Sequence, residues 1–317
     1  MGYNRSANHN INSARKKIQV YKVTKEMELL PFLMEAIHGL SRNATKSYCT
    51  LKYVYVDERL ETKANRLLKP GQQVSIDKTI RKNLFKHPLL DIVYEDNDLI
   101  VVNKKEGLLS VAATQSDKEI TAHRILQDFL KRKDKRNRVF VVHRLDRETS
   151  GLMLFAKSME IQHTLRDHWK DFVFERKYVA VVNGILKQSH DTIHTWLKED
   201  RNFLYTSSDK PGDGIEAVTH YRTLMRNQRR NMTMIDLQLE TGRKNQIRVH
   251  MQSVGHPVVG DYKYGMADGD PLKRLALHAY MLAFNHPVTG KQMRFETAFP
   301  KAFTALMKTN EKPERGR

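Results

Sequence analysis

The 317-residue sequence has a single cysteine, Cys49, which excludes an internal disulfide bond and leaves no cysteine cluster that could hold a metal ion. It has no apolar run long enough to cross a membrane, and its N-terminal residues lack the apolar segment of a secretory signal. We therefore expect a protein of the reducing cytoplasm, with no membrane partner.

The glycines and histidines do not form the patterns that hold common cofactors. Neither a Walker A loop nor a glycine-rich dinucleotide fingerprint occurs, so ATP- or NAD-driven chemistry is not expected. The 14 histidines include the pairs His163/His168, His250/His256 and His278/His286. None of these spacings matches the usual zinc patterns, and Thr149-Ser150-Gly151 lacks the glycine spacing of a serine hydrolase. The sequence predicts no metal site and no cofactor.

Positive charge is the strongest global feature that is present. The formal net charge is +19, and residues 1–88 carry 17 Lys and Arg against 7 Asp and Glu. A surplus of this size is typical of proteins with a polyanionic partner, and nucleic acid is the first candidate. The alternative is that the charge serves only to keep the protein soluble.

The basic front of the chain is predicted to hold an arm, a small module and a linker. Residues 1–17 are polar and aperiodic, which indicates a flexible basic arm or a tail without a binding role. A compact module is expected over residues 18–80. Residues 81–88 form a basic connector that ends in proline and is suitable as a linker.

The module is expected to bind RNA. Apolar positions over residues 27–40 fall on one helical face, a short basic helix follows from Ser41, and strands are predicted at 53–56 and before residue 77. This order resembles the alpha-L RNA-binding domain that is shared with ribosomal protein S-four. The resemblance implies that the short helix and the following strand contact RNA. Its candidate contacts are Arg42, Lys46 and Lys52. The alternative is an unrelated small α/β module.

A polar insert between two apolar runs holds the first candidate catalytic residue. The pattern around residues 143–151 predicts strand, loop and strand. Asp146 lies in the loop, and we expect its neighbours Arg144 and Arg147 to favour the ionised carboxylate. The small Ser150-Gly151 pair is expected to let another chain approach closely. Asp146 is therefore a candidate nucleophile or base.

The remainder of a second domain, residues 89–303, predicts a mixture of strands and helices, and residues 304–317 a polar tail. Strands are predicted over 92–104, from Tyr178 onward, and over 217–225, 232–239, 275–284 and 294–299. Helices are predicted over 122–131 and 159–172, and a loop-rich hairpin over 190–216. Residues 131–138 hold six basic residues in eight. Such a run is usually a solvated loop, with phosphate binding as the alternative.

Two further stretches contain candidate functional residues. Tyr178 begins a strongly apolar strand, where a buried structural tyrosine is the commoner case. Residues 240–251 open with a Thr-Gly turn and predict a helix whose start carries Arg243, Lys244 and Arg248. Helix-start amides together with these cations favour an anion, which makes Arg243 a candidate substrate contact.

A carboxylate with arginines and a tyrosine can act on RNA without a metal or an energy source. An aspartate can attack a sugar or a base covalently, and an arginine can hold that aspartate ionised and aimed. Hydrolysis of a phosphodiester bond would require metal ions or a pair of histidines. Rearrangement of a glycosidic bond requires no metal ion and no energy source.

Three ordered motifs within residues 89–300 closely resemble those of the RluA-type RNA pseudouridine synthases, the group of RluA, RluC and RluD. The motifs are HRLDRETSGLMLFAKS, ERKYVAVVNG and LETGRKNQIRVHMQSVGHPVVGDYKYG. The resemblance implies an α+β fold. A small N-terminal alpha-L domain would precede a catalytic domain built on a mixed, mostly antiparallel sheet with flanking helices and loops.

By the same resemblance, Asp146 matches the catalytic aspartate and Tyr178 matches the tyrosine that stacks on the target uracil. Arg248 matches the basic residue that pairs with the aspartate, and Arg144 matches the arginine that fills the gap left by the flipped nucleotide. Two departures are visible: Asn245 stands where a histidine is common, and Lys105-Glu106-Gly107 replaces the usual Lys-Pro-x-Gly. Neither touches the four matched residues.

The sequence therefore predicts a cofactor-free, monomeric RNA pseudouridine synthase. Large-subunit ribosomal RNA is the favoured substrate and transfer RNA is the alternative. From another class, a non-catalytic RNA-binding or ribosome-assembly factor stays open, as does an N-glycosidase that releases uracil. Whether Asp146 attacks the ribose or removes a ribose proton is also open at this point.

Overall fold

The protein consists of two compact units, Met1–Lys86 and His87–Arg317. Its structure, a computed structural model, describes residues 18–37, 41–50, 53–77, 85–112, 114, 119–265 and 271–308. The arm predicted at 1–17 and the candidate RNA contact Lys52 lie outside the described residues. The division between the units falls within the segment 81–88 that was predicted as a linker.

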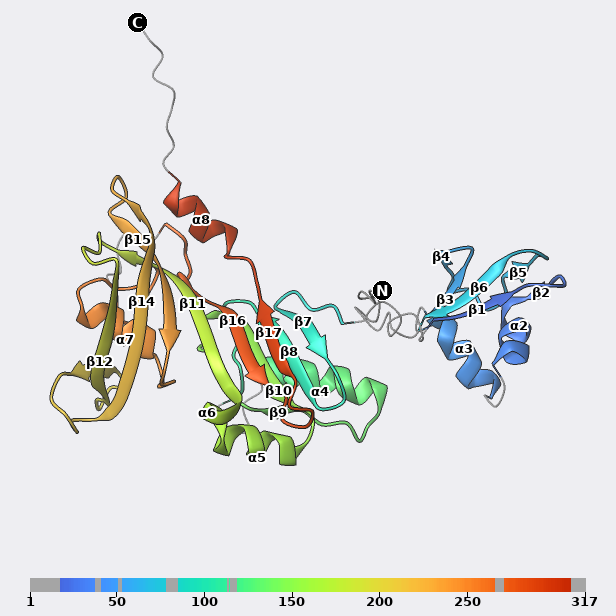
Figure 1. The fold of residues 1–317 in the computed structure, drawn as a ribbon, viewed down its shortest axis with the longest axis horizontal. Coiled ribbons are helices and arrows are strands. Elements are labelled where there is room, and N and C mark those ends of the chain that lie inside the picture. The colour runs from blue at the N-terminus through green and yellow to red at the C-terminus, as the bar shows by residue number, and fades with distance from the viewer. Residues whose placement is uncertain are drawn as a thin grey trace, which may run out of the picture. The chain divides into compact units, whose positions relative to one another are not determined.

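Within the described residues, the smaller unit combines short strands with helices (Figure 1). Its elements are β1 (Ile18–Lys22), β2 (Met27–Glu28), α2 (Leu29–Ala36), α3 (Arg42–Thr50), β3 (Val54–Val56), β4 (Arg59–Leu60), β5 (Leu67–Leu68) and β6 (Gln73–Asp77). One sheet has the order β1-β6-β3-β4, and β2 pairs with β5. Asp57 and Glu58 connect β3 to β4 with positive φ angles of 48° and 65°. The Asp57 carboxylate stabilises this turn by accepting hydrogen bonds from the Gln73 amide and the Gln72 side chain.

The helix predicted over residues 27–40 is shorter than expected. Met27 and Glu28 pair with β5 as a strand, so α2 begins at Leu29, and it ends at Ala36. The apolar face that suggested the helix is confirmed in part, because Leu30 and Leu33 are buried whereas Met34 is exposed. The final part of the predicted helix lies outside the described residues.

The larger unit is built on one mixed sheet of 11 strands within the described residues. Its elements are β7 (Leu90–Glu95), β8 (Leu99–Lys104), α4 (Ala122–Lys133), β9 (Phe140–Val141), β10 (Ser150–Ala156), α5 (Met159–Asp167), α6 (Trp169–Phe172), β11 (Val173–Asn183), β12 (His190–Glu199), β13 (Tyr205–Ser208), β14 (Ile215–Asn227), β15 (Met232–Leu239), α7 (Gln246–Ser253), β16 (Leu277–Asn285), β17 (Gln292–Glu296) and α8 (Lys301–Met307). The main path is β13-β12-β14-β15-β11-β16-β10-β8-β7. The β10–β16 pair is parallel and the other pairs are antiparallel, which confirms the predicted α+β class with a mostly antiparallel sheet.

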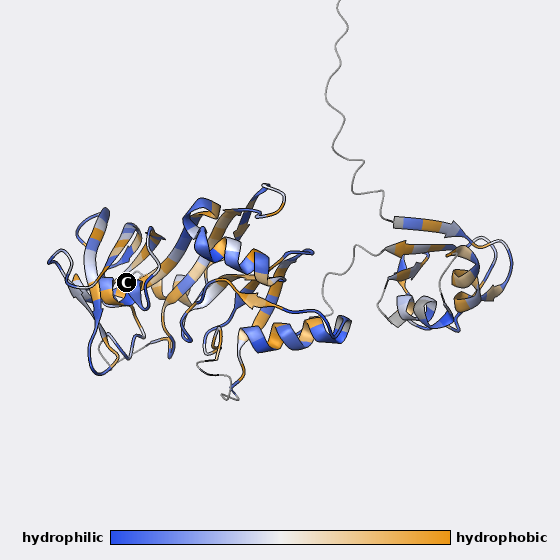
Figure 2. Ribbon diagram, turned by 90° about the horizontal axis from the view of Figure 1, so that it is seen from below, coloured by the Kyte–Doolittle hydropathy of each residue, from blue (hydrophilic) through white to orange (hydrophobic). Residues whose placement is uncertain are grey.

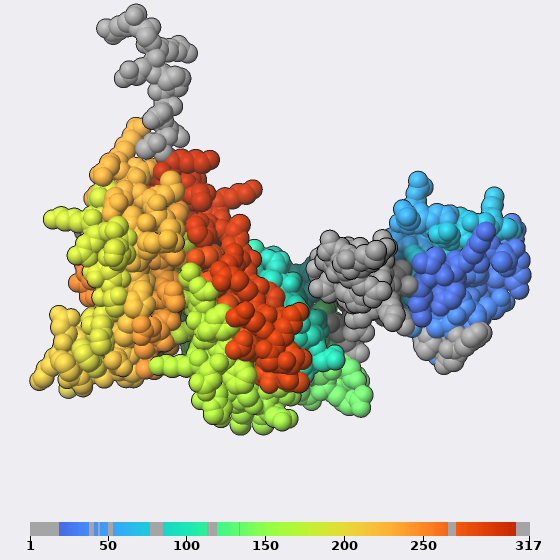
Figure 3. Space-filling view, in the orientation of Figure 1, coloured from blue at the N-terminus to red at the C-terminus, as the bar shows by residue number. Residues whose placement is uncertain are grey.

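Burial explains which strands lie at the centre of this sheet. Every residue of β10 is buried, because β10 lies between β8 and β16 in the sheet and packs against α5. Figure 2 shows apolar residues, in orange, on the strands of both units. In Figure 3 the C-terminal segment, in red, lies beside the surfaces of segments coloured green and teal. Leu99, Leu152 and Phe284, which are far apart in the sequence, belong to one buried apolar cluster.

The close approach predicted at Ser150-Gly151 is confirmed, although the pair begins a strand and is not a turn. Gly151 has a φ of +124° and pairs with Ala279 of β16. A Cβ atom added at Gly151 would lie 2.2 Å from the Ala279 carbonyl oxygen. The parallel contact between β10 and β16 therefore requires glycine at this position.

A Gly151→Ala variant is expected to lose about 2–4 kcal/mol of stability, because both the positive φ and the clash with backbone penalise a side chain. Thermal unfolding should show a melting temperature lowered by roughly 5–15 °C. Gly212→Ala is the matched control, since Gly212 also has a positive φ but has nothing within 4 Å of an added Cβ. Equal shifts in the two variants would show that the packing of β10 on β16 is not the cause.

Three further predictions of secondary structure needed correction. The helix predicted over 159–172 is interrupted at His168, which ends α5 and precedes α6. The loop-rich hairpin predicted over 190–216 contains the ten-residue strand β12 and its partner β13. The last helix continues past the predicted start of the tail, because Leu306 and Met307 are buried and belong to α8.

Helices lie on the sheet at several places. α5 packs on β9 and β10, α6 on β11, α7 on β13 and β14, and α8 on β14 and β15 (Figure 1). In the described residues, no helix combines the length and the apolar character needed to span a membrane.

Candidate active site

The loop between β9 and β10 carries Asp146 and is held in place by neighbouring backbone and side chains. Ser110 Oγ donates to the Leu145 carbonyl oxygen at 2.6 Å and accepts from the Leu145 amide at 3.0 Å. At the start of the loop, His143 Nε2 accepts from the Leu154 amide at 3.0 Å. Burial lowers the pKa of His143 to about 3, so this ring is a neutral structural group.

Lys104 fixes the other side of the same loop. Its side chain is fully buried, and its ammonium donates to the carbonyl oxygens of Lys105, Leu108 and Arg147 at 2.8–3.1 Å. Burial lowers its pKa to about 8, while the charge of Asp146 acts in the opposite direction. The Gly107 amide also donates to the Arg147 carbonyl. The segment that departs from Lys-Pro-x-Gly therefore still anchors the Asp146 loop.

Asp146 itself lies in an environment that disfavours its charge. Its side chain is 23% exposed, and desolvation raises its pKa in spite of the positive charges of Arg248 and Arg144. The expectation that neighbouring arginines favour the ionised carboxylate is therefore wrong in its net direction. Part of the reason is that Arg147 forms a bidentate pair with Glu119 instead.

Tyr178 lies near the middle of β11 and lines the same cavity as Asp146. The β11–β16 ladder shifts register between Lys177 and Tyr178, and such bulges re-aim side chains beside functional sites. Only 9% of the residue is exposed. Burial raises the pKa of the phenol, so the hydroxyl is protonated at neutral pH. The structural and the functional interpretation of Tyr178 are thus compatible.

Arg248 comes from α7 and is 5% exposed. Its main partner is Asp261, whose carboxylate accepts from Nε and Nη2 at 2.7 Å each. Burial acts to lower the pKa of Arg248, but the hydrogen bonds and charge of Asp261, together with the charges of Asp146 and Glu148, raise it and keep the guanidinium protonated. Nη1 lies 4.0 Å from Asp146 Oδ2, at the outer limit of an ion pair. The residue predicted to pair with Asp146 is therefore near it but held by another carboxylate.

Asn245, the departure from the common histidine, also positions Arg248. It precedes α7 in a left-handed conformation with φ 58°. Its side-chain oxygen accepts from Arg248 Nη1 at 3.2 Å, and its amide donates to the Tyr264 hydroxyl at 3.0 Å. The Tyr264 ring lies 5.1 Å from the Arg248 guanidinium.

The helix that follows the Thr-Gly turn begins later than predicted, at Gln246. Arg243 and Lys244 precede it, where Arg243 Nε donates to the Glu216 carbonyl and Lys244 pairs with Glu199. The Gln246 side-chain oxygen accepts from the Arg243 amide at 3.0 Å. The side chains of Arg243 and Lys244 and the Arg243 amide therefore already have partners within the protein.

A cavity of about 630 Å³ brings most of the predicted site residues together. The predicted residues that line it are Arg144, Asp146, Tyr178, Arg243 and Arg248. This volume is typical of a site for a small organic ligand. The other two described candidates, Arg42 and Lys46, are exposed on α3 of the smaller unit.

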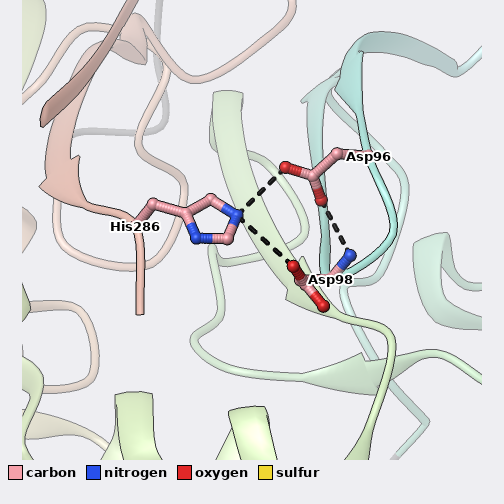
Figure 4. Close-up of side chains that lie close together, drawn as sticks. All are labelled: Asp96, Asp98 and His286. Carbon is pink, nitrogen blue, oxygen red and sulfur yellow. Dashed lines mark hydrogen bonds and ion pairs between the residues drawn. The ribbon is translucent and has the colours of Figure 1, made fainter. Parts of the chain in front are cut away.

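A second cluster, Asp96, Asp98 and His286, has the composition of a metal site (Figure 4). His286 Nδ1 accepts from the amides of Val288 and Thr289 at 3.2 Å, so the ring proton is on Nε2. Nε2 then donates to Asp96 at 3.0 Å. Because a metal at Nε2 would require a proton on Nδ1 facing two N–H donors, the cluster fits a hydrogen-bonded clamp better than a metal site.

Sequence reasoning missed several residues that build the site. Asp261 lies inside the third motif but was given no role, although a carboxylate in such a motif is a signal for a buried arginine partner. Lys104 and Ser110 act on the loop from distant positions in the chain. Trp169 and Arg176 line the cavity from α6 and β11.

Comparison with known proteins connects this geometry to a family. Residues 98–253 match the family described as RNA pseudouridylate synthase. The chain is 35% identical over 260 residues to the uncharacterized RNA pseudouridine synthase YlyB of Bacillus subtilis, covering 79% of this chain and 83% of that protein. It is 31% identical over 317 residues to ribosomal large subunit pseudouridine synthase D of Yersinia pestis, covering 92% and 94%. Among solved structures, human RNA pseudouridylate synthase domain containing 1 matches with a TM-score of 0.52 and 26% identity, covering 66% and 83%.

Proposed function

Because the chain belongs to the family of RNA pseudouridine synthases, and is such an enzyme of the RluA type, we propose that it converts uridine in large-subunit ribosomal RNA to pseudouridine. The observation that carries the proposal is the convergence of Asp146, Tyr178 and Arg248 on one cavity. The ribosomal target is supported by a relative whose name states it, at 31% identity over 92% of this chain. Transfer RNA is the alternative substrate.

The proposed reaction needs one carboxylate and no external reagent. The bond between ribose C1′ and uracil N1 breaks, the uracil turns, and C1′ joins uracil C5. The C5 proton then leaves to solvent and N1 gains a proton, so atoms and electrons balance. Asp146 acts either as a nucleophile on the ribose or as a base that removes a ribose proton.

In this reaction Tyr178 would contact the uracil, and Arg248 would stabilise the Asp146 carboxylate. Tyr178 lines the cavity and is buried, and an aromatic ring there would stack on the uracil. Arg248 places a protonated guanidinium near Asp146, which would stabilise the carboxylate when it carries negative charge.

Entry of the target requires a flipped nucleotide, which costs a few kcal/mol of stacking. Arg144 is exposed at the cavity and forms no hydrogen bond or close ion pair with the described residues. A free guanidinium there could replace the flipped base in the stack and contact phosphate.

We also propose that the smaller unit is an alpha-L RNA-binding domain, over about residues 18–80, that presents the substrate. Arg42 and Lys46 are exposed one helical turn apart on α3, so both could contact phosphate from the same face of the helix. The buried free Cys49 suits a reducing compartment, and we propose a cytoplasmic monomer.

The test is to incubate the purified full chain with carbon-5-tritiated uridine in unmodified ribosomal RNA and in transfer RNA. Tritium release with no free uracil is expected, with ribosomal RNA as the better substrate, and mapping pseudouridines would then give the position. Free uracil would instead indicate an N-glycosidase. RNA binding without tritium release from either RNA would favour a non-catalytic assembly factor.

The raised pKa of Asp146 predicts how activity depends on pH. A carboxylate that must be ionised loses function as pH falls through its folded-state pKa, so the acid limb of kcat/KM should lie above the ordinary aspartate value of about 3.9. Steady-state rates from acid to neutral pH, with circular dichroism to exclude unfolding, would measure this limb. A limb at or below the ordinary value would contradict the environment derived for Asp146.

A further inference from the structure

One wall of the cavity carries residues for which the proposed reaction has no use. It is formed by α6 and the beginning of β11, where Trp169 and Arg176 face the same cavity as Asp146 and Tyr178. Arg166 and Lys170, both exposed, line the cavity beside them. The wall thus combines an aromatic ring with positive charge.

Arg176 is a partly buried cation without a carboxylate partner in the described part of the chain. Its guanidinium contacts the carbonyl oxygens of Leu239 and Thr241 at 3.5 and 3.4 Å, which are long for hydrogen bonds. Burial lowers its pKa. A guanidinium in such a place costs free energy that an incoming anion would recover.

The chain leaves space for this guanidinium at Gly242. A Cβ atom added there would lie 2.7 Å from Arg176 Nη1. The φ of Gly242 is outside the left-handed region, so the backbone alone does not require glycine at this position. A side chain at position 242 would therefore displace the Arg176 guanidinium from its present place.

Trp169 supports Arg176 and completes the wall. Its ring lies 5.6 Å from the Arg176 guanidinium and 5.0 Å from the His143 ring, and it is only partly buried. Tryptophan rings and arginine planes are the surfaces on which unpaired RNA bases stack, and arginine also binds phosphate. Arg176 and Tyr178 are two positions apart on β11, about 7 Å along a strand.

We propose that this wall is a second nucleotide subsite, in which the nucleotide adjacent to the target uridine binds with its phosphate at Arg176 and its base against Trp169. The assignment of the target to the Asp146 side rests on the proposed function. Through this subsite the enzyme would bind at least one nucleotide adjacent to the target uridine, by base stacking and by a phosphate contact.

Fluorescence of Trp169 tests the subsite directly, because the chain has two tryptophans and a Trp196→Phe variant leaves Trp169 as the only one. In the full-length Trp196→Phe variant, titration with the oligonucleotide of five uridines should quench the Trp169 fluorescence in a saturable way. Arg176→Gln should weaken the affinity for this oligonucleotide roughly tenfold. The slope of log affinity against log salt concentration should become less steep by about 0.7, the value for one lost phosphate contact.

Two further variants separate position from charge. Gly242→Ala retains the arginine but displaces its guanidinium, so it should also weaken binding severalfold. Arg201→Gln removes one charge from an exposed residue outside the cavity lining and should change affinity less than twofold. Equal weakening by Arg176→Gln and Arg201→Gln, or a lack of saturable quenching, would overturn the proposal.

The readout does not depend on catalysis. If the parent protein releases no tritium, the proposed function fails, yet quenching that depends on Arg176 still supports the subsite. If tritium is released but Trp169 does not respond to the pentanucleotide, the function stands and the subsite is rejected.

Discussion

An Asp146→Asn variant is expected to release tritium from carbon-5-labelled uridine roughly ten-thousandfold more slowly than the parent, a loss typical of removing an essential reacting group. Asparagine has nearly the same shape, but it can neither attack a ribose carbon as an anion nor accept a proton from it. Both proposed roles of Asp146 therefore predict the same loss. Single-turnover measurements with excess enzyme would separate this loss from any change in RNA binding.

The folding of this variant provides its own control. The folded-state pKa of Asp146 is raised, so the ionised carboxylate opposes folding at pH values above that pKa, and this penalty disappears below the unfolded-state pKa. Asparagine carries no such penalty. Urea unfolding at neutral pH should therefore find the variant at least as stable as the parent, with the difference shrinking as pH falls.

Asp128→Asn is a matched control for the activity measurement. Asp128 is exposed on α4 and does not line the cavity, so its substitution should leave tritium release unchanged. An Asp146→Asn variant as active as the Asp128→Asn control would remove Asp146 from the mechanism. The assembly-factor alternative predicts that outcome in a complementation assay, where only RNA binding would matter.

The sequence could predict residues that carry chemistry in local motifs, but only part of what holds them. Asp146, Tyr178 and Arg248 come from three separate segments, and the structure brings them to one cavity. The sign of the Asp146 pKa shift was not predictable, because sequence neighbours such as Arg147 point elsewhere while desolvation depends on the whole fold. Proximity in sequence is a poor guide to electrostatics around a buried group.

For the fold as well, the sequence predicted individual strands but not their arrangement. Apolar alternation identified most strands, since it reflects burial of single residues. It did not give the order of the sheet, because the parallel contact of β10 with β16 joins residues more than 120 positions apart, such as Ser150 and His278. Residues 190–216 predicted a loop-rich hairpin because several positions of β12 are polar and exposed, yet β12 pairs with β14 along its length.

An Asp261→Asn variant is expected to lose about 3–5 kcal/mol of stability, the usual cost of leaving one partner of a buried ion pair without compensation. The Asp261 side chain is fully buried and holds the Arg248 guanidinium through two hydrogen bonds of 2.7 Å. Asparagine can still accept from the amides of Lys263 and Tyr264, as Asp261 Oδ1 does, so the local turn is preserved. The melting temperature should fall by on the order of 10 °C.

The same variant should change the chemistry in a way that simple destabilisation would not. Without Asp261, the carboxylates left within 4.0 Å of Arg248 among the described residues are Asp146 and Glu148. The guanidinium should then shift toward Asp146 and favour its ionised form, which moves the acid limb of kcat/KM to lower pH. A melting shift with an unchanged pH profile would show that Asp261 stabilises the fold but does not position Arg248.

A double variant distinguishes an unpaired charge from lost packing. Arg248→Met together with Asp261→Asn removes the buried cation, and methionine fills much of the same volume. We expect it to recover most of the stability that Asp261→Asn loses, while tritium release stays low because Arg248 is absent. If the double variant were as unstable as the single one, the cost would come from contacts of Asp261 other than its pair with Arg248. Recovery would instead show that Asp261 is needed because the site keeps a protonated arginine buried beside Asp146.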